Sequence, residues 1–446
     1  MSNKKYYFPE KKVDKKLFVG EKYKHITKYN LPQKVEYCKI CLYTNQRPTR
    51  RSEQNINKNE DIQETTRYID GICEACRIKD KWKDVDWNKR EHEFKKILDQ
   101  YRSRNGHYDV VVPGSGGKDS FYVAHQLKHK YNMNPITVTF APYIYTDWGW
   151  KNMECWSHAG LENYLNTPNQ KIYRLLSRIA LENFFHPWHP WTVGHKAFPV
   201  KFAKNFNIPL VIYGDSPGEY GQNEYNADYN IEWHTCEKKE NVLFSGENVE
   251  TLKSFGLKEY DLEPFWPMTK EEYRNANIRV LAYSFFNKWH PQGNYYYSVE
   301  HSDPLKPFAI APERTYGSHS KYCSIDDVMD HIMFVTTYVK FGIGRASADV
   351  SQEIRNGDIS KAEGIKLIKK FDHEFPENIS EQVFNYLSID EKSFGSKIYQ
   401  QFERPKIDRE YFDQMSDYFR PPHLWKKTNE GMELRNKIED YFSKKI

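Results

Sequence analysis

One short segment constrains the fold of this chain more than any other: a run of β-branched residues that breaks into glycines and restarts as a helix. Three valines at positions 110–112 favour a strand, and Pro113-Gly114-Ser115-Gly116-Gly117 ends it. Asp119 and Ser120 are typical residues for the start of a helix. The pattern predicts a strand, a turn and a helix, with the glycines at the carboxyl end of the strand.

The residues that follow predict a parallel sheet. Apolar residues recur on one helical face over 121–127, and residues 136–140 form a second expected strand after Asn134-Pro135. A third strand is expected at 209–213 and ends in a second glycine-containing turn at 214–218. Strands that alternate with helices in this way indicate an α/β fold, and ligands favour the carboxyl edge of its sheet.

Elsewhere the sequence favours helices. Residues 161–206 have the pattern of helices interrupted by a rigid loop at 186–190, where two prolines stand among aromatic residues. A further helix is expected from Ser324, which would cap it, with Asp326 and Asp327 as acids of the first turn.

The length of 446 residues exceeds the usual size of one domain, and the composition suggests three parts. We expect an N-terminal region over 1–100, with a cysteine-bearing module at about 36–80 and a polar loop at 50–66. The α/β domain is expected over 101–345, and a helical C-terminal region over 346–446.

Composition also excludes some classes of protein. Hydrophobic residues make up 39% of the chain and aromatic residues 16%, which is too aromatic for a disordered chain. A net charge of +5 gives little support for binding a polyanion, so nucleic acid is not an expected partner. No stretch approaches the roughly eighteen apolar residues of a membrane span, and no apolar core follows the lysine-rich residues 1–16. We therefore expect a cytoplasmic protein without membrane contact.

Four of the seven cysteines form two Cys-x-x-Cys pairs, Cys38 with Cys41 and Cys73 with Cys76. Four thiolates in two pairs suit a tetrahedral structural zinc, since four sulfurs leave no open coordination position. The alternatives are buried free cysteines, which need no such spacing, and a redox site, which needs one pair rather than two. An odd number of cysteines also fits a reducing compartment better than a disulfide framework.

The turn Ser115-Gly116-Gly117-Lys118-Asp119-Ser120 is the strongest candidate for a binding site. Its glycines let the backbone approach a ligand closely, and free amides at a helix N-terminus attract phosphate. A Walker A loop needs Ser or Thr after its lysine, and here Asp119 follows Lys118. The alternative is a glycine-rich turn that serves packing alone.

This turn resembles the SGGxDS loop of the PP-loop ATP pyrophosphatases at every defining position. The resemblance implies a parallel-sheet, HUP-like domain of the adenine nucleotide alpha hydrolase type, which binds ATP and transfers its adenylyl group with release of pyrophosphate. Ser115, Gly116, Gly117 and Ser120 would hold the pyrophosphate. Asp119 would act through Mg²⁺, since a bare carboxylate would repel the phosphates.

A wider set of motifs resembles one family, the bacterial N-acetyl sugar amidotransferases. The motifs are CKIC at 38–41 with Arg47-Pro48, GICEACR at 71–77, HPW at 186–188, YGD at 213–215, EYG at 219–221, DD at 326–327, KFGIGRA at 340–346, QEIR at 352–355 and EFP at 374–376. The similarity therefore runs from about Cys38 to Pro376.

The resemblance implies an enzyme that converts the acetamido group of a bacterial surface sugar to an acetamidino group, on the way to lipopolysaccharide O-antigen or to the nonulosonic acids of flagellin. An amide oxygen is a poor leaving group, so ATP would adenylate it to an O-adenylyl imidate, which ammonia attacks as AMP leaves. This reaction needs Lys118 and a second cation near the α-phosphate, for which Lys340 and Arg345 are the candidates. Solvated charges at a helix end are the alternative for both.

Further contacts are expected around the same edge of the sheet. Gly214 and Asp215, in the turn after the third strand, would bind the nucleotide. The acceptor is expected to be a nucleotide-activated N-acetyl sugar, and an aromatic residue of the loop at 186–190 could stack on it, although such residues more often anchor a small core.

Ammonia needs a source outside this chain. An in-chain glutaminase of the N-terminal nucleophile type would begin with cysteine after removal of methionine, whereas this sequence begins Met1-Ser2-Asn3. None of the unpaired thiols, Cys155, Cys236 and Cys323, lies in a recognisable nucleophile turn. The family resemblance implies a separate glutaminase as partner.

Two other functions are kept open. A PP-loop enzyme that thiolates tRNA would share the loop and would need a persulfide-carrying cysteine, such as Cys155 or Cys323, beside a basic groove that +5 hardly supports. A scaffolding protein with a decayed nucleotide site would have no use for the intact SGGKDS loop.

Overall fold

The computed structural model describes residues 13–48, 65–216, 218, 245–254, 256–395 and 406–443. Most of the predicted polar loop at 50–66, the EYG motif at 219–221 and Cys236 lie outside these residues.

A five-stranded sheet forms the centre of the molecule, and all of its neighbouring strands are parallel. Its spatial order is β5-β4-β3-β6-β7, with the first expected strand in the middle. The bounds are β3 Val110–Pro113, β4 Pro135–Phe140, β5 Glu162–Asn166, β6 Leu210–Tyr213 and β7 Arg279–Ala282. The α/β fold and the three predicted strands are confirmed.

Alternate residues of β3 (Val110–Pro113) pack into two cores on opposite faces of the sheet. Val110 and Val112 join the core that holds α3 (Trp87–Tyr101) and α4 (Lys118–His129). Val111 joins the core that holds α7 (His189–Asn205). A parallel strand covered on both faces explains why its sequence is apolar throughout.

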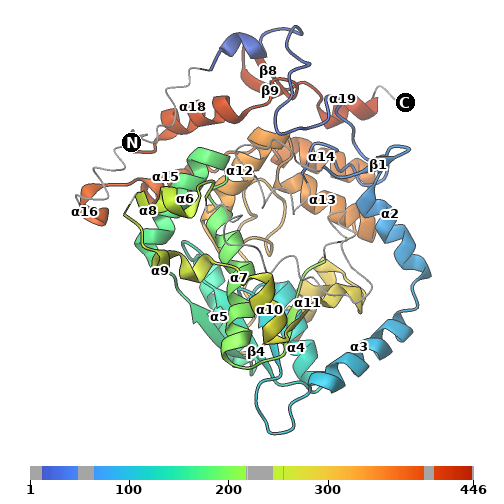
Figure 1. Cartoon of the computed structure of the whole chain (residues 1–446). Coiled ribbons are helices and arrows are strands. Elements are labelled where there is room, and N and C mark those ends of the chain that lie inside the picture. The colour runs from blue at the N-terminus through green and yellow to red at the C-terminus, as the bar shows by residue number, and fades with distance from the viewer. Residues whose placement is uncertain are drawn as a thin grey trace.

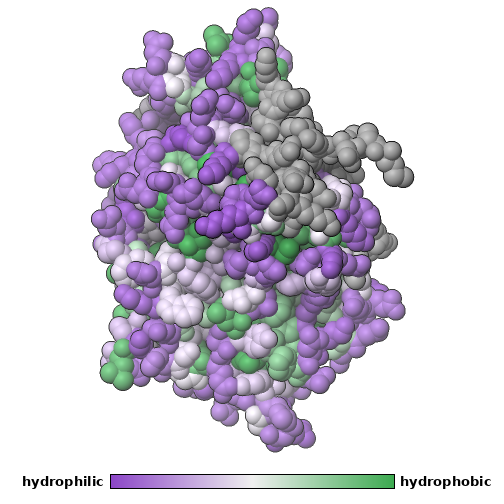
Figure 2. Space-filling view, turned by 90° about the vertical axis from the view of Figure 1, so that its left-hand side faces the viewer, coloured by the Kyte–Doolittle hydropathy of each residue, from purple (hydrophilic) through white to green (hydrophobic). Residues whose placement is uncertain are grey.

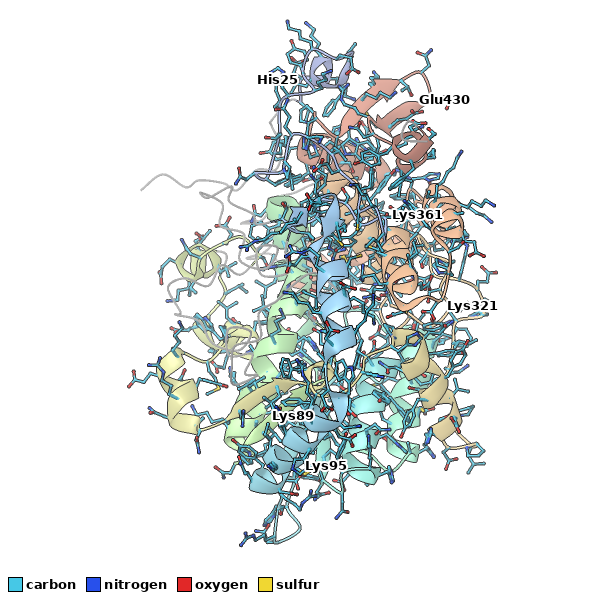
Figure 3. The ribbon with its side chains drawn as sticks, turned by 90° about the vertical axis from the view of Figure 1, so that its right-hand side faces the viewer. His25, Lys89, Lys95, Lys321, Lys361 and Glu430 are labelled. Carbon is cyan, nitrogen blue, oxygen red and sulfur yellow. The ribbon has the colours of Figure 1, made fainter. Side chains whose placement is uncertain are left out.

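Helices surround the sheet and build the rest of the chain (Figure 1). Their bounds are α2 Glu74–Lys81, α5 Asp147–His158, α6 Gln170–Phe184, α8 Val249–Ser254, α9 Glu259–Leu262, α10 Lys270–Ala276, α11 Pro291–His301, α12 Met329–Phe341, α13 Arg345–Asn356, α14 Lys361–Phe371, α15 Glu377–Leu387, α16 Glu391–Phe394, α18 Arg409–Phe419 and α19 Ile438–Ser443. Helices α2 and α3 run along one side, where Lys89 and Lys95 of α3 are exposed (Figure 3).

Two expectations about local structure are wrong, and a third is incomplete. The edge strand β5 was expected to be helical, but its residues pair with β4, and Asn163 donates to the hydroxyls of Thr137 and Thr139 at 2.9 and 3.0 Å. Residues 186–190 do not form one rigid loop, because α7 begins at His189 with Pro190 in its first turn, where a missing amide costs nothing. The described residues of the C-terminal region form helices, as expected, and also a hairpin of β8 (Trp425–Thr428) and β9 (Gly431–Leu434), which was not expected.

The N-terminal module and the C-terminal region share one hydrophobic core. Phe18, Cys38 and Leu42 pack with residues of the C-terminal part such as Val350 and Trp425. Figure 1 shows the N-terminal segments beside β8, β9 and α19, far along the chain. Two short strands, β1 (Tyr68–Ile69) and β2 (Ile72–Cys73), complete the module.

The molecular surface is mainly hydrophilic on the face shown in Figure 2, with apolar side chains in small scattered groups. Within the described part of the chain, every helix falls short of the length and apolar character that crossing a membrane requires.

Candidate functional site

The glycine-rich loop lies where the sequence predicts it, between β3 and α4 at the carboxyl edge of the sheet. Gly116 has a φ of 88°, and a β-carbon there would lie 2.8 Å from the carbonyl oxygen of Asn152. Gly117 is the N-cap residue of α4 and has no side chain to bind the amides of the first turn. The loop is thus a tight turn that ends at a helix N-terminus, which suits a phosphate group.

Lys118 and Asp119 form an ion pair at the start of α4, with 2.6 Å between Nζ and Oδ2. Burial alone would lower the pKa of Lys118, but the charge of Asp119 outweighs this effect and raises it, so the lysine stays an ammonium ion. Helix α11 supports the pair: Asn294 donates to Asp119 Oδ1 at 2.8 Å, and Ser298 donates to the carbonyl of Lys118 at 3.1 Å. No motif marks Asn294 or Ser298, because their role arises from the packing of α11 on α4.

The turn after β6 contacts the same loop. A β-carbon on Gly214 would lie 2.9 Å from the carbonyl oxygen of Asp119, so the two turns meet backbone to backbone. Asp215, the next residue, faces the open space in front of the loop. The structure therefore brings the predicted nucleotide-binding residues of both turns together.

A cavity of about 330 Å³, here called the loop cavity, opens in front of this edge of the sheet. Its wall includes these residues from several elements: Ser115, Gly117, Lys118, Asp119, Ser120, Asn152, Trp188, Trp191, His195, Gly214, Asp215, Tyr322, Cys323, Ser324, Asp326, Asp330, Phe334 and Arg345. All of the predicted residues of the two turns except Gly116 line it.

A second chamber of about 230 Å³ adjoins the loop cavity, because seven residues line both. They are Trp188, Trp191, His195, Asp215, Met333, Phe334 and Arg345. Its remaining wall includes Arg47 of the cysteine module and Lys196 of α7. The arrangement offers two connected spaces, one at the glycine-rich loop and one lined by aromatic and cationic side chains.

Aromatic rings form a stack along the boundary between the two spaces. The ring centroids of Trp188 and Trp191 lie 4.2 Å apart, and those of Trp191 and His195 lie 4.4 Å apart with nearly parallel planes. The sequence predicts that an aromatic residue of 186–190 could contact the sugar, and Trp188 of this segment lines both cavities. The stack continues into α7 through Trp191, which we did not predict.

The two candidate cations of the C-terminal motif lie in different places. Arg345, the first residue of α13, lines both spaces and pairs with Asp349 at 2.9 Å. Lys340 is buried at the end of α12 and donates to the carbonyl of Phe184 at 3.0 Å, and it lines neither space. Of the two, only Arg345 stands at the cavity wall.

The start of α12 differs from the expectation. The helix begins at Met329, and Ser324 has a φ of 52°, so Ser324 is not its cap. Asp327 accepts hydrogen bonds from the amides of Met329, Tyr143 and Ile144 at 2.9, 2.7 and 3.2 Å. Asp326 lines the loop cavity instead of serving as a first-turn acid, because the chain turns before the helix begins.

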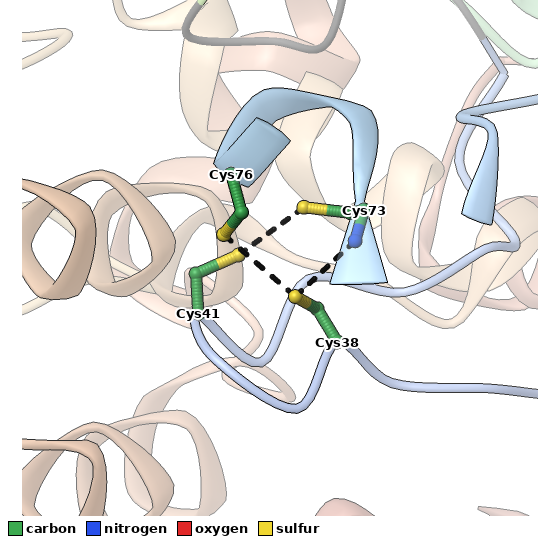
Figure 4. Close-up of side chains that lie close together, drawn as sticks. All are labelled: Cys38, Cys41, Cys73 and Cys76. Carbon is green, nitrogen blue, oxygen red and sulfur yellow. Dashed lines mark hydrogen bonds between the residues drawn. The ribbon is translucent and has the colours of Figure 1, made fainter. Parts of the chain in front are cut away.

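The four paired cysteines form a cluster in which all ligand sulfurs lie within 4.8 Å of one another (Figure 4). The Cys38–Cys76 and Cys41–Cys73 sulfur distances are 3.7 and 3.5 Å. A tetrahedral zinc with Zn–S bonds of about 2.3 Å places its sulfurs about 3.8 Å apart. The donor set and its spacing fit, so the cluster could bind a zinc ion, as predicted.

The cluster is joined to the wall of the second chamber on both of its sides. The amide of Cys38 donates to the carbonyl of Tyr43 at 2.7 Å, and Tyr43 lines the chamber. Arg355, at the end of α13, donates to the sulfur of Cys41 at 3.3 Å, while Arg345 at the start of the same helix lines the chamber. A metal ion bound by the cysteine cluster would therefore hold Tyr43 and α13, two parts of the chamber wall, in place.

Fold and site together define an α/β protein with a glycine-rich, phosphate-type loop at the carboxyl edge of a parallel sheet. Residues 316–439 match the family described as LPS biosynthesis protein WbpG-like, C-terminal domain. The match includes Arg345 and α12 to α15. The C-terminal part of the chain is thus similar to a domain of LPS biosynthesis proteins. A comparison with curated proteins found no match.

Proposed function

We propose that the protein is an ATP-dependent amidotransferase that converts the acetamido group of a bacterial surface sugar to an acetamidino group. One observation carries the proposal: Lys118 and its neighbours in the first turn of α4 line a cavity that joins a second chamber lined by aromatic and cationic residues. The WbpG-like match at 316–439 supports an enzyme of LPS biosynthesis, and the motif resemblance supports this reaction. Lipopolysaccharide O-antigen and nonulosonic acids are the proposed products.

The residues of the loop cavity suit a nucleotide. Ser115, Gly117 and Ser120 would hold the β- and γ-phosphates with their amides and hydroxyls, and Lys118 would neutralise charge as pyrophosphate leaves. ATP supplies the adenylyl group: the amide oxygen of the sugar bonds to the α-phosphorus, and the bond to pyrophosphate breaks. Arg345 lines this cavity and would stabilise charge on the α-phosphate.

The second chamber suits the acceptor sugar. The indole of Trp188 or Trp191 presents a flat apolar face, and Arg47 and Lys196 provide cations for an anionic group such as the diphosphate of an activated sugar. Because the chamber adjoins the loop cavity, an acetamido group could reach toward the α-phosphate. Ammonia then bonds to the activated carbon, AMP leaves with the former amide oxygen, and a proton is released.

A separate glutaminase subunit is the proposed source of ammonia. In the cell this glutaminase would supply the ammonia. The isolated protein should therefore turn over only when ammonium is added. Adding a glutaminase with glutamine should replace that requirement.

The test is mass spectrometry of the nucleotide and sugar products after incubation with ATP, Mg²⁺, ammonium and a panel of nucleotide-linked N-acetyl sugars. The expected products are AMP, pyrophosphate and a sugar in which one oxygen has become NH. Ser115→Ala and Arg345→Ala should lose this product, while Arg409→Ala, an exposed arginine on α18, should keep it. Absence of any modified sugar across the panel, with AMP formed, would count against the acceptor assignment.

One observation favours a second candidate, a PP-loop enzyme that thiolates tRNA. Cys323 lines the loop cavity together with Lys118. Cys155 is fully buried, and burial raises the pKa of its thiol to about 12, so it is a poor persulfide carrier. Turnover that starts only when tRNA and a sulfur donor are added, and stops in Cys323→Ser, would support this alternative.

A further inference from the structure

Two carboxylates line the loop cavity without a cation paired to either. Asp326 and Asp330 both contribute to the wall of this cavity, together with Lys118 and Asp119. The side chain of Asp330 is almost fully buried, and its Oδ1 has no hydrogen-bond partner in the described part of the chain. Neither carboxylate forms a salt bridge with any described residue.

Asp327, which lies between them in the sequence, caps the start of α12, whereas Asp326 and Asp330 do not. Asp327 is fully buried, and its oxygens accept three backbone amides, including that of Tyr143 at 2.7 Å. Its carboxylate is therefore used in fixing the start of α12 against the segment after β4. Asp326 has the hydroxyl of Ser115 and its own amide as partners, and Oδ1 of Asp330 has no partner among the described residues, so neither is fixed by a set of amides from other segments as Asp327 is.

The charges around the pair make this arrangement unfavourable by itself. A buried carboxylate without a counter-ion is strongly disfavoured, and a bound polyphosphate would add like charge. Arg345 lines the same cavity, but its guanidinium is engaged with Asp349 at 2.9 Å.

We propose that Asp326 and Asp330 hold a divalent cation that bridges this wall to phosphate oxygens in the loop cavity. The bridging role rests on the proposed function of the loop, whereas the cation site itself does not. Asp119 is the weaker candidate for the ligand, because Asn294 engages its Oδ1 at 2.8 Å and Lys118 engages its Oδ2 at 2.6 Å. The proposed ligands of the divalent cation are therefore Asp326, before α12, and Asp330, within α12, in place of Asp119.

The chemistry of the pair favours Mg²⁺ or Mn²⁺ over zinc. Among the described residues, only the cysteine cluster brings three or more ligand atoms within 4.8 Å, so the acids do not form a closed cage. Mg²⁺ is commonly held by one or two carboxylates, with water and substrate phosphates in the other positions. The loop cavity leaves room for such ligands beside Lys118.

The experiment measures Mn²⁺ binding to the full chain without nucleotide, by the loss of the free-ion signal in electron paramagnetic resonance. Asp326→Asn and Asp330→Asn should each weaken binding at least about tenfold, whereas Asp119→Asn should change it much less. Glu313→Gln, an exposed acid on the loop before Ser324, is the matched control and should bind as the wild type does.

Thermal unfolding separates loss of the site from loss of the fold. Without metal, Asp330→Asn should unfold at the same or a higher temperature than the wild type, because it removes a buried carboxyl oxygen that has no partner, and Mn²⁺ should stabilise it less than the wild type. Unchanged Mn²⁺ binding in both Asn variants, or a loss confined to Asp119→Asn, would overturn the proposal. Mn²⁺ binding that persists while ATP fails to bind would support the cation site and count against the nucleotide role of the loop.

Discussion

Replacing Gly116 with alanine should destabilise the protein and damage its loop by two separable effects. The φ of 88° disfavours any side chain, at about 1–3 kcal/mol. The added β-carbon would also lie 2.8 Å from the carbonyl oxygen of Asn152, and relieving that overlap costs about 1–3 kcal/mol more. Gly106 has a similar φ of 81° but nothing within 4 Å, so Gly106→Ala should show only the first effect.

Urea unfolding measures the two variants against the wild type, and titration with a fluorescent ATP analogue measures the loop. Gly116→Ala should be less stable than Gly106→Ala by about 1–3 kcal/mol and should bind the analogue weakly. A third variant, Gly214→Ala, tests the contact alone, since its β-carbon would press on the carbonyl of Asp119. Equal stability of the first two variants, with full nucleotide binding by Gly116→Ala, would refute this reasoning.

Three further outcomes are expected. Metal analysis of protein prepared without chelators should find about one zinc per chain, and Cys38→Ser should lose it; a metal-free wild type would exclude the site. Glu182→Ala should lower the unfolding free energy by about 3–5 kcal/mol, because Arg178, fully buried with it, loses a carboxylate 2.7 Å away. Glu377→Ala, which breaks an exposed pair, should cost less than about 1 kcal/mol, and equal losses in urea would contradict the burial argument. Burial lowers the pKa of His125 to about 4, so this histidine is neutral in the folded state, and the protein loses stability as pH falls from about 6.5 to 4. His125→Gln should remove about 1–2 kcal/mol of that loss. Identical dependence of the unfolding free energy on pH in the variant and the wild type would contradict this expectation.

The sequence predicts those parts of the fold in which a single physical requirement, such as burial on both faces of a sheet, determines the residue types. The valines at 110–112 are buried on both faces, so their apolar run is unambiguous. Strand β5 escaped notice because it lies at the edge of the sheet, where Asn163 replaces an apolar residue by binding two threonine hydroxyls. Ser324 has the composition of a cap, but its left-handed backbone belongs to a turn that only the tertiary structure requires.

The sequence likewise predicts the local motifs of the candidate site but not the residues that join it through tertiary packing. The glycine-rich loop and the four cysteines are local patterns whose chemistry can be inferred from spacing alone. Arg345 and Lys340 are close in the sequence, yet only the first lines the cavities, because the second is turned toward the carbonyl of Phe184. Asn294 had no sequence signal, since an asparagine at that place gains its role only when α11 lies on α4. Asp330 was missed for the same reason.

The shared core of the two ends of the chain sets an order of events during synthesis. Tyr29 donates to the carbonyl of Phe419, and Tyr37 to that of Asn436, both at 2.8 Å. The last cysteine of the cluster, Cys76, leaves the ribosome some 360 residues before Asn436, roughly 20–70 s earlier at about 5–20 residues per second. During that interval the cysteine module is complete in sequence but lacks the partner surface that buries it. The nascent chain must therefore keep this apolar surface from aggregation until translation is nearly over, which makes the module a natural substrate for chaperones.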